Sequence, residues 1–128
     1  MKLDVFTLFP SWFGWFREQR HVQNALRLGH ALDTVDLRAT TPLRAGQVDD
    51  APYGGGAGMV IRVDVVEAAL RGRWGADPVE GRGNRRVIAL AAGGHPFDDA
   101  LADELAAEVG GRGAPYPDTP LDVVGPGE

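Results

Sequence analysis

The chain contains no cysteine among its 128 residues, which excludes disulfide bonds and thiolate metal sites. It also has no apolar run near the roughly 18 residues that a membrane-spanning helix needs. The first residues, MKLDVFTLFP, include an acidic residue and lack a small-residue cleavage site, so we expect no secretory signal peptide. These absences lead us to expect a cytoplasmic protein with no membrane partner.

The chain lacks the net positive charge that is typical of nucleic-acid binders. Thirteen basic and 18 acidic residues give a formal net charge of −5, which argues against a general nucleic-acid binder. Residues 1–44 hold six Lys/Arg and four Asp/Glu (+2), whereas residues 45–128 hold seven and fourteen (−7). The first part therefore carries enough positive charge for a basic face that contacts phosphates. The alternative is that these charges are ordinary solvated surface residues.

The residues that hold metals or act as nucleophiles are few and scattered. Three histidines, His21, His30 and His95, share no ligand spacing, and Ser11 has no base nearby in the sequence. We therefore assign no metal site and no catalytic residue. The acidic pair Asp49–Asp50 has two interpretations, a solvated turn or carboxylates that accept hydrogen bonds from a guanine edge.

Strand and helix patterns alternate along the chain. We expect strands at residues 3–9, 34–39 and 86–92, a short extended segment at 59–63, and helices from Trp12, around 22–28, over 64–72 and over 98–108. This order predicts an α/β fold with an open, largely parallel sheet and flanking helices. An aromatic cluster at residues 12–16 is interpreted as core, with a partner or dimer surface as the alternative.

Four glycines fall within five positions of the segment PYGGGAGM, residues 52–59. No Lys-Ser/Thr follows Gly58, so the segment is not a phosphate-binding P-loop, and its place between the chain's halves excludes the dinucleotide fingerprint. Residues 40–58 lack periodicity, and a connection of that length is usually functional or disordered. The segment is either an elaborate turn or a loop that brings a ligand close to backbone amides.

A second candidate site follows the strand expected at residues 86–92, where AAGGHPFD begins. Ligands of open α/β sheets bind at the carboxyl ends of strands, although an ordinary strand-to-helix turn explains the same residues. Beyond it, residues 109–128 are rich in Gly and Pro and predict an irregular, disordered tail, with only Leu121–Val124 weakly strand-like. We therefore divide the chain into an incomplete domain at 1–108 and a tail at 109–128.

Three segments occur in an order that resembles one family. They are KLDVFTLFPSWF, VDDAPYGGGAGMV and RVIALAAGGHPFDDALADELA. Together they resemble the bacterial tRNA (guanine-N1)-methyltransferases over residues 1–108. The resemblance implies S-adenosylmethionine as cofactor, tRNA as partner, a homodimer, and the N-terminal part of a knotted methyltransferase domain of the SPOUT class.

The resemblance also implies roles for particular residues. The expected substrate-binding residues, at the target guanine and its neighbouring base, are Asp50, Tyr53, Gly54, Gly55, Gly56, Gly58 and Met59. The expected cofactor-binding residues are Leu90, Ala91, Ala92, Gly93 and Gly94. Family members usually have Leu-Ser-Pro-Gln-Gly at the second set, so here only backbone contacts are expected to remain.

The end of the chain departs from the family. The segments CGRYEG and SIGDYVLSGGE, which form the knot, and the second domain with its catalytic aspartate have no counterpart. We therefore expect a truncated or frameshifted form that has little activity by itself in transferring a methyl group to N1 of the guanosine 3′ to the anticodon. The alternatives are a non-catalytic remnant that keeps a dimer or tRNA-binding surface, and an unrelated nucleotide-binding α/β module.

Overall fold

The computed structural model describes residues 1–75, 85–109 and 122–125, and the chain divides into two units, Met1–Pro78 and Val79–Glu128. The first unit contains β1 (Lys2–Thr7), η1 (Pro10–Phe13), α1 (Gly14–Glu18), α2 (Arg20–Arg27), β2 (Ala31–Asp36), α3 (Leu37–Thr40), η2 (Arg44–Gly46), β3 (Asp49–Asp50), β4 (Val60–Ile61) and α4 (Val63–Trp74). The second contains β5 (Ile88–Pro96), α5 (Asp99–Val109) and β6 (Asp122–Gly125).

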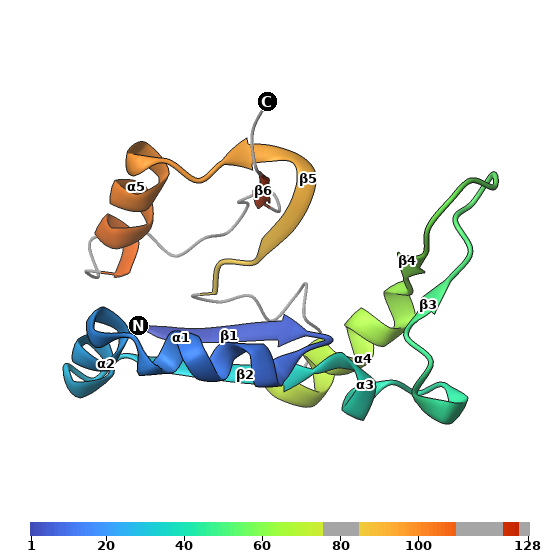
Figure 1. Ribbon diagram of the computed structural model, residues 1–128, viewed down its shortest axis with the longest axis horizontal. Helices are drawn as coiled ribbons and strands as arrows, with labels where there is room; N and C mark the ends of the chain where they lie inside the picture. The colour runs from blue at the N-terminus through green and yellow to red at the C-terminus, as the bar shows by residue number, and fades with distance from the viewer. Residues whose placement is uncertain (76–84, 110–121, 126–128) are drawn as a thin grey trace. The chain divides into compact units, whose positions relative to one another are not determined.

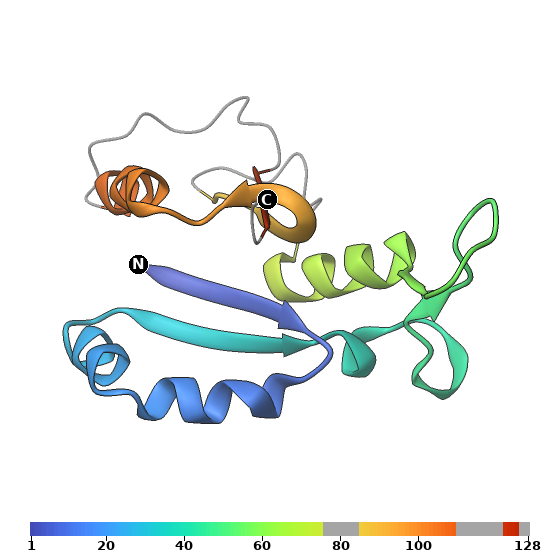
Figure 2. The same cartoon turned by 45° about the horizontal axis from the view of Figure 1, so that its top comes forward.

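The first unit is built on a parallel pair of strands. β1 and β2 pair in register from Lys2 opposite Ala31 to Thr7 opposite Asp36. The connection between them passes through α1 and α2, as a parallel crossover requires. These helices run along one side of the pair and α4 lies on the other side (Figures 1 and 2). The predicted α/β class with parallel strands and flanking helices is confirmed.

The core of this unit lies between α4 and the strand pair. Successive strand residues point to opposite faces, so Phe6 of β1 and Val35 of β2 share the face that α4 covers. Four buried residues form the core: Leu37, Val48, Val65 and Ala69. Phe6, Leu8, Val35 and Leu43 pack against them. Val65 and Ala69, four residues apart on α4, are both 0% exposed, as expected for the inward stripe of a helix.

One arginine joins α4 to both strands. Arg73 Nη2 donates to Asp4 Oδ1 at 2.7 Å and also to Asp33 Oδ2, while Trp74 Nε1 donates to Asp4 Oδ2 at 3.2 Å. The Trp74 ring meets Phe6 edge to face, with centroids 5.6 Å apart. The hydrogen bond from Arg73 lowers the pKa of Asp4, and the two carboxylates raise the pKa of Arg73.

The predicted ends of one strand and one helix in this unit are wrong. The strand expected at residues 34–39 ends at Asp36, whose Oδ1 accepts the Arg38 amide at 2.8 Å and begins α3. The helix expected over 64–72 runs on to Trp74, and Gly75 ends it with φ +74°. No side chain caps the start of this helix, and the carboxylate of Asp64 in its first turn pairs with Arg62.

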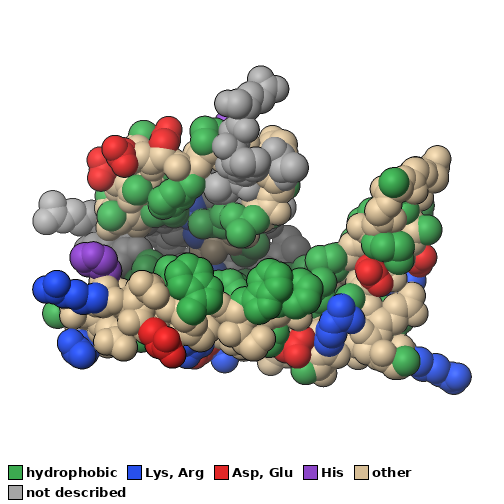
Figure 3. Space-filling model, in the orientation of Figure 1, with side chains coloured by type: hydrophobic (Ala, Val, Ile, Leu, Met, Phe, Trp, Pro, Cys, Tyr) green, Lys and Arg blue, Asp and Glu red, His purple; other side chains and the backbone are tan. Residues whose placement is uncertain are grey.

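The core interpretation of the aromatic cluster is also wrong. Trp12 is 65% exposed and Trp15 is 63% exposed, and Figure 3 shows hydrophobic side chains gathered over η1 and α1. The helix is broken into a 3₁₀ turn after Pro10, the five-residue α1, and α2 after the extended Gln19. Such short pieces cannot turn four adjacent aromatic residues inward together.

The second unit pairs β5 with β6 in parallel, from Ile88 opposite Asp122 to Pro96 opposite Gly125. The predicted helix over 98–108 is confirmed as α5, whose first turn receives a cap because Leu101 N donates to Asp98 Oδ1 at 2.9 Å. β6 matches the strand-like residues of the tail. The rest of the tail and residues 76–84 lie outside the described residues. The predicted disorder and the 1–108 domain boundary therefore stay predictions. No helix in the described ranges is long and apolar enough to span a membrane.

We predict that Val65→Ala lowers the free energy of unfolding by about 2 kcal/mol, because it removes two buried methyl groups and leaves a cavity. Val63→Ala is the matched control, since Val63 is 82% exposed on the same helix. Urea unfolding followed by circular dichroism measures both. Equal losses from the two variants would show that α4 does not pack on the core as described.

We also predict that Asp4→Asn weakens the dependence of the free energy of unfolding on pH in the acidic range. The pKa of Asp4 is lowered from 3.8 in the folded chain. Its carboxylate therefore stabilises the fold above about pH 4, and this contribution is lost as pH falls through the lowered pKa. The stability difference between wild type and Asp4→Asn should be largest at about pH 5–7 and shrink as the pH falls through the lowered pKa, as measured by urea unfolding at each pH. Asp49→Asn is the control for the loss of one charge.

Candidate functional site

The glycine-rich segment forms a loop on a short hairpin. β3 and β4 pair antiparallel, with Asp49 opposite Ile61 and Asp50 opposite Val60. At the foot of the hairpin Arg62 N donates to Val48 O at 2.9 Å, and the Val48 side chain is buried in the core. The loop is therefore rooted in the packed part of the unit, although its ladder has only two residues in each strand.

The loop backbone explains why glycine occurs so often. Gly54, Gly55, Gly56 and Gly58 have φ values of +88°, +79°, +120° and +102°. Residues with a Cβ rarely adopt these angles. A Cβ built at any of the four meets no heavy atom within 4 Å, so packing inside this chain does not demand glycine there. The backbone conformation requires the glycines, and their surfaces stay open.

The loop projects from the end of the hairpin as an arm of the first unit (Figure 1). The two large side chains at its ends are uncovered, since Tyr53 is fully exposed and Met59 is 62% exposed. Exposed apolar groups next to open backbone are typical of a binding surface. The structure thus brings the predicted substrate-binding residues together on one arm.

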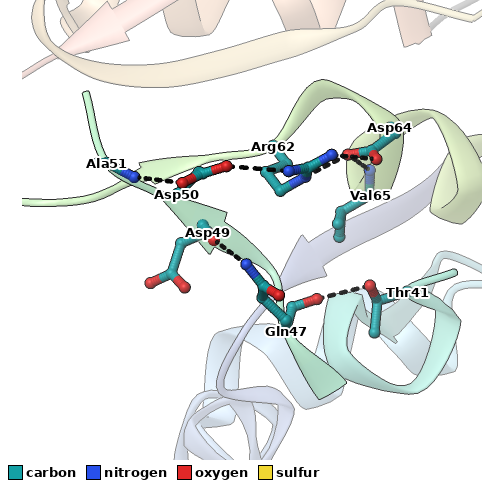
Figure 4. A network of polar contacts seen from close by, with 8 residues as sticks. All are labelled: Thr41, Gln47, Asp49, Asp50, Ala51, Arg62, Asp64 and Val65. Atoms are coloured by element: carbon teal, nitrogen blue, oxygen red, sulfur yellow. Dashed lines mark hydrogen bonds and ion pairs between the residues drawn. The ribbon is translucent and has the colours of Figure 1, made fainter. Parts of the chain in front are cut away.

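The two strands of the hairpin are joined by a charged network at its base (Figure 4). Arg62 Nη1 donates to Asp50 Oδ2 at 3.0 Å. On the other side Nε and Nη2 donate to the two oxygens of Asp64 at 3.0 and 2.9 Å. The hydrogen bond from Arg62 lowers the pKa of Asp64, and the two carboxylates raise the pKa of Arg62.

The acidic pair is divided between two environments. Asp50 Oδ1 accepts the Ala51 amide at 2.8 Å, so each of its oxygens already holds one hydrogen bond. Asp49 points away from Arg62 in Figure 4, and within the described residues nothing bonds to its carboxylate. Its backbone carbonyl accepts from Gln47 Nε2 at 3.1 Å. The two carboxylates do not act on a common partner in this structure.

Sequence analysis missed Arg62. Asp50 and Arg62 are twelve residues apart, and only the hairpin register brings them together. The available signal was the alternation of acidic and basic residues on either side of the loop, Asp50 before it and Arg62 and Asp64 after it. The charge pattern identifies Asp50 and Arg62 as partners only once β3 is paired with β4.

The predicted cofactor residues 90–94 lie within β5 rather than in a separate turn. The register shifts there, because Leu90 and His95 both pair opposite Val124 and the residues between them bulge from the ladder. Leu90, Ala91 and Gly93 are exposed, and a Cβ at Gly93 meets nothing within 4 Å. These side chains supply no charge or hydroxyl group. A ligand that lay against this segment would therefore meet backbone groups and apolar side chains.

The loop and the predicted cofactor segment belong to different units, Met1–Pro78 and Val79–Glu128. No group of three or more His, Cys, Asp or Glu side chains in the described parts of the chain is placed to hold a metal ion.

The fold matches that of a solved methyltransferase. The structure is similar to the tRNA (m1G37) methyltransferase from Aquifex aeolicus, with a TM-score of 0.64 and 22% sequence identity. The match covers 97% of this chain and 50% of that one. At this identity the likeness shows the fold alone.

The family is established by sequence. The model of the family described as tRNA (Guanine-1)-methyltransferase TrmD matches residues 1–109, and the chain belongs to this family. The tRNA (guanine-N(1)-)-methyltransferase of a Thermus thermophilus strain is 42% identical over 109 residues, 84% of this chain and 42% of that protein. The enzyme of Rhodospirillum rubrum is 39% identical over 107 residues, with the same 42% share of its length. The chain thus spans about two fifths of these relatives.

We predict that Gly56→Ala reshapes the arm without unfolding the unit, because the residue has φ +120° with open space around it. Amide chemical shifts of residues 53–59 should change, while the urea midpoint stays close to that of the wild type. Gly72→Ala, in the interior of α4, is the matched control, and it should stabilise the helix by about 0.5–1 kcal/mol. Unchanged loop shifts in Gly56→Ala would contradict the described loop conformation.

Proposed function

We propose that this chain serves methyl transfer from S-adenosylmethionine to N1 of the guanosine 3′ to the anticodon of tRNA. In this proposal the arm from Tyr53 to Met59 lies against the target guanine. The observation that carries it is the exposed glycine loop within the part that matches the tRNA (guanine-1)-methyltransferase family. The proposed partner, tRNA, is the support for the expected cytoplasmic location.

The chemistry of a guanine fits what the arm presents. A flat base with donors and acceptors on its edge can lie close to a backbone that carries no side chains, as at Gly54–Gly56 and Gly58. The exposed ring of Tyr53 offers a surface on which a base can stack. Stacking of single-stranded bases on aromatic side chains is favourable and depends little on the identity of the base. Asp50 stands at the entry to the arm, where a carboxylate can accept from a neighbouring base.

The reaction needs a base for the N1 proton and a methyl donor. S-adenosylmethionine, when bound, supplies an electrophilic methyl group on a sulfonium. Within the described residues we assign the segment 90–94 to contacts with its adenine through backbone groups, and we assign no residue as the base. The chain's own share is to position the guanine. The expected homodimer would bring a second copy of the same arm to the assembly.

Binding without catalysis is the second candidate. It is favoured by the exposed aromatic residues of η1 and α1, which form a surface next to Arg17 and Arg20 with no cover in the described part of the unit. Calorimetric titration with S-adenosylmethionine separates the candidates. Micromolar binding supports a working cofactor site, whereas tRNA binding without cofactor binding supports the remnant.

The proposal predicts that the chain binds a 17-nucleotide anticodon stem–loop RNA with guanosine 3′ to the anticodon, and binds the same RNA with adenosine there more weakly. Tyr53→Ala should weaken binding roughly tenfold, the loss expected from one base-stacking contact. Phe97→Ala, which removes another exposed aromatic ring, is the control and should bind as wild type. Fluorescence anisotropy of labelled RNA measures the affinities.

The same RNA pair, incubated with the chain and methyl-labelled S-adenosylmethionine, tests catalysis. We expect little turnover, because no described residue is assigned as the base. Rapid labelling at guanine N1 would overturn that expectation. Equal affinity for the two RNAs, together with no effect of Tyr53→Ala, would contradict the role proposed for the arm.

A further inference from the structure

We propose that Arg62 is a positioning residue that fixes the glycine arm for guanine binding by joining Asp50, at the arm's entry, to Asp64 in the first turn of α4. The link to guanine rests on the proposed function, whereas the effect on the arm stands on the structure alone. Nothing in the family match assigns a role to this side chain.

The geometry gives Arg62 two different contacts. The guanidinium forms a two-point contact with Asp64, through Nε to Oδ1 at 3.0 Å and Nη2 to Oδ2 at 2.9 Å. The remaining nitrogen, Nη1, reaches back across the hairpin to Asp50 Oδ2 at 3.0 Å. A planar fork of this kind suits arginine, because lysine presents a single point charge. Figure 4 shows the three side chains in one line across the base of the arm.

The helix side of this link is fixed. Asp64 is followed directly by Val65, whose side chain is fully buried and whose amide donates to Asp64 Oδ1 at 3.0 Å. At its other end α4 is held to both strands through Arg73. Arg62 therefore ties the arm to the most firmly packed helix of the unit.

The arm side has little else to hold it. The β3–β4 ladder has two pairs, the four positive-φ glycines make no packing contact at a Cβ position, and Tyr53 is fully exposed. Glycine has the largest backbone entropy to lose, so the order of the arm depends on contacts at its base. Exposed ion pairs add little to global stability, and loss of this one should open the arm locally without unfolding the unit.

The test compares Arg62→Gln, Arg62→Lys and Arg27→Gln in the 128-residue chain. Arg27→Gln removes the same charge on α2, where, among the described residues, the side chain has one hydrogen bond, from Nη1 to Asn24 Oδ1 at 3.4 Å. Amide hydrogen exchange of residues 49–62 reports on the arm, and anisotropy with the labelled stem–loop RNA reports on binding. In Arg62→Gln we expect exchange about fivefold faster and affinity lower by a similar factor, with an unchanged urea midpoint. Arg62→Lys should recover part of both, and Arg27→Gln should leave exchange at the wild-type rate.

The outcomes separate the inference from the proposed function. Wild-type exchange in Arg62→Gln overturns the inference, and weaker RNA binding at wild-type exchange shows instead that Arg62 contacts RNA itself. Faster exchange in a chain whose wild type binds no RNA supports the positioning of the arm and contradicts the proposed function. If Arg62→Gln fails to fold, Asp50→Asn replaces it, because the Asp64 contact then remains. Wild-type exchange in Asp50→Asn overturns the inference as well.

Discussion

Arg73 makes the contact on which the first unit depends, because it holds α4 against both strands of the parallel pair. Its guanidinium meets Asp4 of β1 and Asp33 of β2, residues 69 and 40 positions away in the chain. A two-stranded sheet is marginal alone and needs a covering helix. Arg73 fixes the C-terminal end of α4, and Val65 and Ala69 pack in the core. The N-terminal end of the helix can therefore anchor the glycine arm that precedes it.

The glycine arm illustrates how a small ordered base can present a large open surface. The base of the arm is held by two residue pairs of the β3–β4 ladder and by the Asp50–Arg62–Asp64 network. Beyond that base it uses glycine to reach backbone angles that other residues avoid. The result is an arm whose backbone and single aromatic ring are accessible to a flat ligand. This division suits a site in which a partner, rather than the chain's own core, covers the loop.

The fold class and most elements could be predicted from periodicity and from turn residues. The apolar runs indicated β1 and β5, and the acid-led amphipathic pattern indicated α5. The aromatic cluster could not be assigned in the same way, because hydrophobicity indicates which residues avoid water and not what covers them. The 3₁₀ turn of η1 and the break at Gln19 divide that helix into short pieces, and Trp12 and Trp15 stay exposed on this unit.

The sequence by itself determined the family, the α/β order and the place of the glycine loop, because motifs and periodicity are local properties. The tertiary structure alone decided which charges meet. It paired Asp50 with Arg62 across the hairpin, left Asp49 pointing away, and placed Asp64 in an ion pair with the same arginine. It also turned residues 90–94 from an expected turn into a bulge of β5. Such pairings depend on strand register and on the packing of segments distant in the chain, and no local pattern carries that information.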